Sequence, residues 1–152
     1  MYERRRVMLS KKKVISPLYI YEEGYTKFEN VLQISYTNTK MPTLYWYDDS
    51  VRIVRNSSEV HETGGQSLLL KVDFTYYNKL TIEWQTSKVD TGPYLGYSLN
   101  GKDFIERVEG SISGPKTTEF NISGLKGEYY IKLQPGAGSD YGLSIMMIKL
   151  EM

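Results

Sequence analysis

The chain of 152 residues has no cysteine and a single histidine, His61. Without thiols the protein can form no disulfide, no thiolate nucleophile and no cysteine-ligated zinc site. One imidazole is too few for a histidine-based transition-metal cluster. A Ser–His–Asp triad would have to rest on His61 alone, and this residue lies in the polar stretch VHETGG, so we expect an ordinary surface-loop histidine.

Long apolar runs and helical periodicity are also missing. No segment approaches the ~18 consecutive apolar residues of a membrane span, and the N-terminus has no apolar stretch long enough for a signal peptide. No window of about 11 residues repeats apolar side chains at helical spacing. Hydrophobic residues make up 40% and charged residues 24%, which indicates a globular chain, and the length suits one domain.

What the sequence does contain is a series of short strand-like segments separated by turn signals, a pattern typical of an antiparallel β-sandwich. They begin at residue 17 and are densest between residues 68 and 150. We therefore predict an all-β fold of about nine or ten strands. The segments are PLYIY (17–21), VLQISY (31–36), TLYWY (43–47), VRIVR (51–55), SLLLKVDF (67–74), KLTIEWQT (79–86), YLGYSL (94–99), FIERVEG (104–110), TTEFNI (117–122), EYYIKL (128–133) and LSIMMIKLE (143–151).

Apolar residues at every second position identify the predicted core, because successive side chains of a strand point to opposite faces. These positions are Leu68, Leu70 and Val72; Leu80, Ile82 and Trp84; Tyr129, Ile131 and Leu133; and Met146, Ile148 and Leu150. Two turns are also predicted. The DDS sequence at 48–50 joins two segments as a hairpin, and Asn100-Gly101 tolerates the positive φ angles of a tight turn.

The net charge of +1 conceals two regions of opposite sign. Residues 1–13 carry six basic side chains against Glu3, whereas the remainder has 13 basic and 17 acidic residues. We predict a basic arm at 1–16 attached to a mildly acidic domain at 17–152. Such arms bind acidic protein surfaces or nucleic acid, or they remain solvated. Of these alternatives, nucleic-acid binding is the least favoured here. The residues of the arm expected to bind a partner are Arg4, Arg5, Arg6, Lys11, Lys12 and Lys13.

Signals for catalysis or cofactors are weak. The stretch GSISGPKT (110–117) superficially matches a phosphate-binding loop, but Pro115 stands where the loop needs a glycine N–H before Lys116. No pair of carboxylates stands out for glycoside hydrolysis, so we expect no enzyme and no cofactor. A structural calcium stays open because oxygen ligands suffice for it. Its candidate ligands are Glu22, Glu23, Asp48, Asp49 and Asp140.

Tyrosine is abundant, with 14 residues, and suits both strands and recognition surfaces. In the run from Tyr45 to Tyr47, either Trp46 or the two tyrosines point outward, because alternate residues change face. Tyr94 and Tyr141 lie beside glycine-rich turns. We therefore predict that Tyr94, Tyr141, Tyr45 and Tyr47 are exposed rings able to stack on sugars.

Four stretches resemble segments of known domains. SLLLKVDFTYYNKLTIEW is similar to a strand–strand pattern in minor structural and tail proteins of phages from Gram-positive bacteria. SLNGKDF resembles a hairpin of galactose-binding-like jelly rolls, and SGLKGEYYIKL with LSIMMIKLE looks like the closing strand pair. The resemblance covers about residues 66–152 and, more loosely, LYIYEEG.

The resemblance implies a jelly roll of the galactose-binding-like kind in a virion, in the tail, the baseplate or the head. Together with the charge split, it predicts a non-enzymatic structural or accessory protein, anchored by its arm to other virion proteins as part of a homo-oligomer. The sandwich would then face outward toward host cell-wall polysaccharide. The alternative is a free carbohydrate-binding module that recognises such a polysaccharide. Family members are usually much longer chains, and no position here matches a sugar-binding motif, so fold alone leaves the choice open.

Overall fold

The computed structural model describes residues 17–37, 40–55, 66–86, 93–110, 114–136 and 142–152. Within these residues the chain forms eleven strands and no helix, so no helix of the described part could cross a membrane. The strands are β1 (Leu18–Tyr21), β2 (Gln33–Tyr36), β3 (Thr43–Trp46), β4 (Val51–Val54), β5 (Leu68–Asp73), β6 (Lys79–Thr86), β7 (Tyr94–Ser98), β8 (Phe104–Glu109), β9 (Lys116–Asn121), β10 (Glu128–Gln134) and β11 (Leu143–Glu151).

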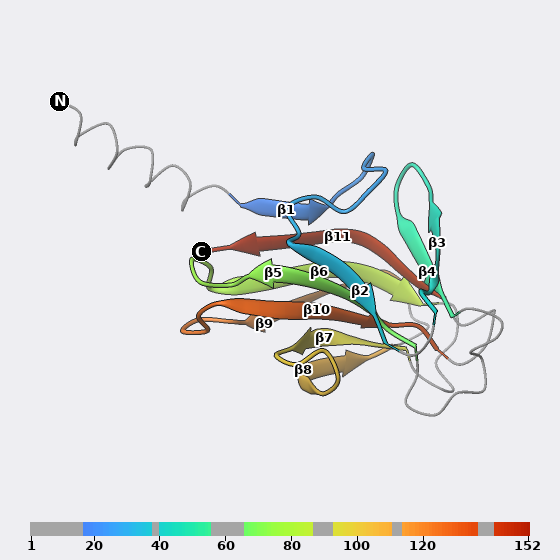
Figure 1. The fold of residues 1–152 in the computed structure, drawn as a ribbon. Helices are drawn as coiled ribbons and strands as arrows, with labels where there is room; N and C mark the ends of the chain where they lie inside the picture. Colours follow the sequence, from blue (N-terminus) through green and yellow to red (C-terminus); the bar gives the residue numbers. More distant parts are fainter. Residues whose placement is uncertain (1–16, 38–39, 56–65, 87–92, 111–113, 137–141) are drawn as a thin grey trace.

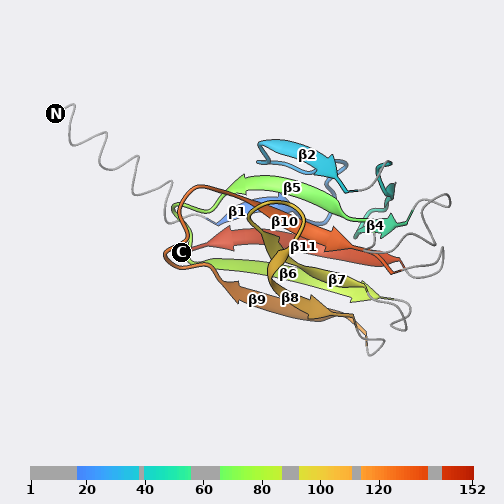
Figure 2. The same ribbon diagram turned by 60° about the horizontal axis from the view of Figure 1, so that its bottom comes forward.

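The strands form two antiparallel sheets stacked face to face (Figures 1 and 2). One sheet has the order β3-β4-β11-β6-β9, with β1 also paired to β11, and the other has the order β2-β5-β10-β7-β8. The predicted antiparallel β-sandwich is therefore confirmed. Each of the eleven strands overlaps one of the segments identified in the sequence, so the number is slightly higher than the predicted nine or ten.

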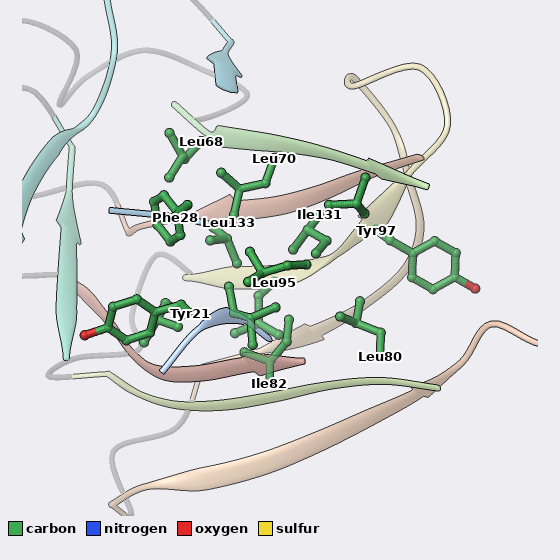
Figure 3. Packing of buried hydrophobic residues seen from close by; sticks show 14 of the residues in the cluster. Tyr21, Phe28, Leu68, Leu70, Leu80, Ile82, Leu95, Tyr97, Ile131 and Leu133 are labelled. Atoms are coloured by element: carbon green, nitrogen blue, oxygen red, sulfur yellow. The ribbon is translucent and has the colours of Figure 1, made fainter. Parts of the chain in front are cut away.

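The core lies between the sheets and follows the predicted alternation. Leu70 and Ile131 from one sheet and Leu80 and Ile82 from the other are fully buried, and Figure 3 shows these side chains pointing toward one another. Trp84 also belongs to this layer, and its indole Nε1 donates to Thr118 Oγ1 at 2.8 Å. Burial of this apolar layer is the main stabilising contribution to the fold.

A β-bulge in β11 changes the prediction for its second half. Ile145 pairs with Trp84 and Met147 pairs with Glu83, which leaves Met146 as an extra residue between them. Ile145 and Ile148 are fully buried, whereas Met146 is half-buried and does not share their face. The assignment of Met146 to the core was therefore wrong, because strict period-two reading cannot register an inserted residue.

An aromatic cluster fixes the β3–β4 hairpin against the end of β1. Trp46 lies 5.1 Å from Phe28 and 6.0 Å from Tyr21, measured between ring centroids. The turn predicted at 48–50 is confirmed, since the N–H of Tyr47 donates to the carbonyl of Ser50 at 2.8 Å. Because Trp46 packs inward, Tyr45 and its neighbour at 47 are the ones that point outward.

Tyr97 provides a test of this packing in alkali. Its ring is 4% exposed and its hydroxyl donates to Glu106 Oε2 at 3.1 Å, and burial followed by this hydrogen bond raises the pKa of Tyr97 to about 12. The folded state thus holds this proton more tightly than the unfolded chain, whose tyrosine pKa is about 10. Stability should be fully present below about pH 10 and lost as the pH rises toward 12. Urea unfolding across this range should show the decline, and Tyr97→Phe should make it shallower; an identical slope in the variant would contradict the assignment.

Candidate functional site

The outer face of the five-stranded sheet is the part of the molecule with the most distinctive chemistry. Leu95 and Tyr97 of β7 are buried in the core, so Tyr94, Gly96 and Ser98 face outward. The register of β10 and β8 with β7 sets their neighbours on this face. On the β10 side these are Gln134, Lys132 and Tyr130, and on the β8 side Glu109, Arg107 and Phe104.

Gly96 lies at the centre of this face, between Lys132 on one side and Arg107 on the other. The backbone of β8 passes so closely that a Cβ atom at Gly96 would lie 1.9 Å from the carbonyl oxygen of Glu106. No residue with a side chain fits there without moving β8. The glycine therefore permits the close approach that brings the outward side chains of three strands together.

Aromatic rings and cations alternate across these strands, and we call Tyr94, Arg107, Phe104 and Lys132 the ladder. The guanidinium carbon of Arg107 lies 4.2 Å from the centre of the Tyr94 ring and 5.8 Å from that of Phe104. The Nζ atom of Lys132 lies 4.7 Å from the centre of the Phe104 ring. A guanidinium stacked on a ring keeps its N–H donors at its edge, where a ligand can reach them.

The β7–β8 loop, residues 99–103, folds over one end of this face, and Figure 2 shows it in front of β10. Asn100 Oδ1 accepts hydrogen bonds from the N–H groups of Lys102 and Asp103 at 2.8 and 2.9 Å. A Cβ at Gly101 would lie 3.1 Å from Leu69 and 3.6 Å from the Tyr130 ring, so the loop covers both residues. The predicted Asn-Gly turn is thus a wider, side-chain-braced loop, with the positive φ of 82° at its glycine.

Lys132 is a buried cation, 4% exposed, beneath this loop. Its amine donates to the carbonyl oxygen of Lys102, which ties the loop to β10. Burial is the main influence and lowers the pKa of Lys132; the charge of Arg107 lowers it further, while Asp103 opposes both. A charged amine placed here costs free energy unless the loop and the Phe104 ring compensate.

Replacement of this lysine tests the balance. In Lys132→Met the aliphatic volume is kept and the buried charge is removed, so we expect the free energy of unfolding at neutral pH to change by less than about 1 kcal/mol. Both variants lose the hydrogen bond to the loop, but in Lys132→Ala a cavity also opens, so the cost should be about 2 kcal/mol or more. Urea denaturation measures both, and equal losses in the two variants would contradict this account.

The predicted glycan-contact residues lie on two different sheets. Tyr94 is part of the ladder and half-buried, with Arg107 over its ring. Tyr45 and Tyr47 are about half exposed, at 49% and 52%, but belong to the β3–β4 hairpin of the other sheet. Tyr141 and the six basic residues of the arm lie outside the described residues. Tyr94 alone of the four tyrosines is therefore placed with other functional candidates in the described part of the chain.

Arg107, Phe104 and Lys132 were not among the residues singled out from the sequence. In FIERVEG the alternation is broken, since the register shifts between Tyr97 and Ser98 where β8 pairs with β7. Lys132 was placed on the outward face by its neighbours Ile131 and Leu133, but nothing local shows that β10 lies beside β7. Knowledge that β7 pairs with β10 would have identified Lys132, but this pairing joins segments far apart in the sequence and leaves no local pattern.

The six-stranded sheet carries an acidic groove on its outer side, with a volume of about 410 Å³. Its lining residues are Tyr19, Glu22, Glu23, Asp49, Glu83, Met146 and Met147. Three of the five candidate calcium ligands meet here, while Asp48 is not in the lining and Asp140 lies outside the described residues. In the described part of the chain, no group of three or more acidic or histidine side chains is arranged to hold a metal ion.

Comparison with known proteins gives relatives by structure only. No protein-family model matches the sequence, and no curated protein matches it. Solved structures of family 29 carbohydrate-binding modules do match. One, a variant complexed with cellulohexaose, has a TM-score of 0.63 at 11% identity over 89% of each chain. Another, complexed with mannohexaose, has a TM-score of 0.62 at 14% identity over 89% of this chain and 90% of that one.

A third structure, a family 29 module from Piromyces equi, has a TM-score of 0.58 at 15% identity over 89% of both chains. The fold is a jelly-roll β-sandwich. The jelly roll expected from the sequence is therefore confirmed, and it agrees with the galactose-binding-like architecture. At these identities the likeness concerns the fold alone.

Proposed function

We propose that this chain is a non-catalytic carbohydrate-binding module whose ligand lies on the outer face of the five-stranded sheet. The observation that carries the proposal is the ladder, which joins ring faces and hydrogen-bond donors on one surface. Sugar rings stack on aromatic faces through their C–H groups, while charged donors bind their oxygens. An open face of this kind suits a polymer chain better than a single small molecule.

The structural relatives support the choice of a glycan as ligand. They come from work on ligand recognition in family 29 modules, with variants in which a tyrosine, an arginine, a lysine and two aspartates were replaced. Two of them were solved with hexasaccharides, named as cellulohexaose and mannohexaose. The same types of side chain meet on the outer face here, as Tyr94, Arg107, Lys132 and Asp103.

Binding to hexasaccharides and to extracted cell-wall polysaccharides tests the proposal. We expect dissociation constants in the micromolar to millimolar range by calorimetry, and backbone amide shifts concentrated in β7, β8 and β10. The mass of each bound oligosaccharide should be unchanged after prolonged incubation, as a non-catalytic role requires. Amide shifts confined to β3, β4 and β11, or no glycan bound at millimolar concentration, would overturn the proposal.

A second proposed role, compatible with the first, is that of a virion structural or accessory protein. It is favoured by the charge split, which places six basic residues in the first thirteen, and by the resemblance of residues 66–152 to phage structural domains. In this role the arm binds an acidic surface of another virion protein and the sandwich faces outward. The test replaces all six basic residues of the arm by glutamine in the full chain. Particles assembled with this variant should lack the protein, and normal incorporation would remove the role.

A further inference from the structure

The most exposed cation of the ladder has no acidic partner among the residues that the structure describes. Arg107 is solvent-exposed, and its contacts among the described residues are with the rings of Tyr94 and Phe104. The ion pairs between described residues involve other residues: Lys27 with Glu29, Lys71 with Glu128, Lys79 with Glu119 and Glu151, and Lys149 with Glu151. The guanidinium is therefore held in place by rings, while its N–H donors are left without a protein acceptor in the part of the chain that the structure describes.

This arrangement differs from what a neutral sugar needs. A neutral sugar needs a bare ring face and acceptors for its hydroxyl groups as well as donors. Here Arg107 covers one face of Tyr94 at 4.2 Å, and Lys132 lies 4.7 Å from the centre of the Phe104 ring. A ligand that settles over the ladder thus meets a planar cation whose paired donors match the two oxygens of a carboxylate or phosphate.

The charges around the ladder allow one anionic group and little more. Lys71 is already paired with Glu128 at 3.3 Å. Arg107 and Lys132 then lie near Asp103 and Glu109, so the placed charges are equal in number, and of the two cations Arg107 is the exposed one. Glu109 lies directly across from Tyr94 and would repel a densely charged polymer. The local balance favours a sugar with a single acidic substituent at this position.

We propose that the ladder recognises an anionic sugar residue, a uronate or a sugar phosphate, whose acidic group binds the edge of the Arg107 guanidinium. This inference rests on the proposed glycan-binding function and names the class of glycan. Tyr94 and Phe104 act by holding the guanidinium flat before the ligand arrives, which reduces the entropy lost on binding. Lys132 adds positive potential from beneath the β7–β8 loop.

The test compares ligands of matched length and linkage. The probes are mannohexaose, the same hexasaccharide with one mannose replaced by mannuronate, and mannohexaose carrying one phosphate monoester. We expect at least one acidic probe to bind about tenfold or more tightly than mannohexaose, since charge-assisted hydrogen bonds are stronger than neutral ones. The carboxylate and phosphate probes show which acidic group is preferred.

Two variants of the full chain locate the effect. Arg107→Ala should remove the preference for acidic probes, and Arg52→Ala, a change of the same type on the six-stranded sheet, should keep it. A third protein has the six basic residues of the arm replaced by glutamine, because the arm could attract any polyanion. The preference should survive in this protein, and it should weaken as the salt concentration rises, because salt screens the attraction between exposed charges.

The possible results separate failure of the anionic-sugar inference from failure of the proposed glycan-binding function. Equal binding of neutral and acidic probes, with mannohexaose binding intact, overturns the inference and leaves the proposed function standing. A preference that persists in Arg107→Ala or disappears with the arm cations also overturns the inference. Failure of every glycan to bind overturns the inference and the proposed function together.

Discussion

Tyr94→Ala should weaken oligosaccharide binding by about thirtyfold, or about 2 kcal/mol, because it removes a stacking ring and a cation–π contact. The ring of Tyr94 is the one over which the guanidinium of Arg107 lies at 4.2 Å. Without it the arginine regains rotamer freedom that binding must then remove. Titration calorimetry with a hexasaccharide measures the loss, and Tyr94→Phe should retain most of the affinity because the ring is kept.

Tyr45 and Tyr47 supply the matched controls. They are about half exposed, at 49% and 52%, and belong to the opposite sheet, so Tyr45→Ala and Tyr47→Ala should leave the affinity unchanged within about twofold. Loss of binding in these variants with normal binding by Tyr94→Ala would place the ligand on the six-stranded sheet. All the variants should keep the wild-type unfolding midpoint within a few degrees, since surface substitutions cost little.

Gly96→Ala should destabilise the protein by about 3 kcal/mol or more, the upper part of the range for overpacked sites. The added methyl would lie 1.9 Å from the Glu106 carbonyl oxygen and 2.8 Å from the Cα of Arg107, and both are backbone atoms that cannot rotate away. The two strands β7 and β8 would have to separate. Much of a typical domain stability of about 5–15 kcal/mol would be lost.

Gly124→Ala separates steric overlap from backbone strain. Gly124 has a φ of +82° but no atom within 4 Å of an added Cβ, so its substitution should cost only about 1 kcal/mol. Urea unfolding gives both values. A Gly96→Ala variant as stable as Gly124→Ala would show that β8 does not approach β7 as closely as described. Even where Gly96→Ala remains folded, Arg107 should no longer stack on the Tyr94 ring, and glycan binding should be lost.

The sequence predicted the core well where strands are regular. In β5, β6 and β10 the apolar residues predicted for the core are buried, with Tyr129 partly buried, because a strand with one face in the core places apolar residues at every second position. The prediction failed at Met146, where the bulge in β11 breaks that period. A bulge leaves no local signature in LSIMMIKLE, in which both methionines are apolar and suit either face.

The candidate site was harder to predict than the core. Tyr94 was found from its position beside a Gly-Pro turn, but its partners lie on β8 and β10, and their proximity depends on pairing between distant segments. Lys132 pairs across the sheet with Gly96, which is 36 residues away in the sequence. Long-range pairing is decided by the packing of the whole sandwich rather than by local pattern.

The loop at 99–103 makes the two ends of the outer face of the five-stranded sheet different. It stands over Leu69 and Tyr130 at one end of the outer face, while the end at Tyr94 and Gln134 has no such cover from the described residues. A polysaccharide following the strands would therefore meet a wall and present its terminal sugar there, whereas one crossing the strands would pass by with both ends free. For a bound chain that follows the strands, we expect the length of this loop to decide whether the proposed module binds chain ends or chain interiors, and a shortened loop should admit chain interiors.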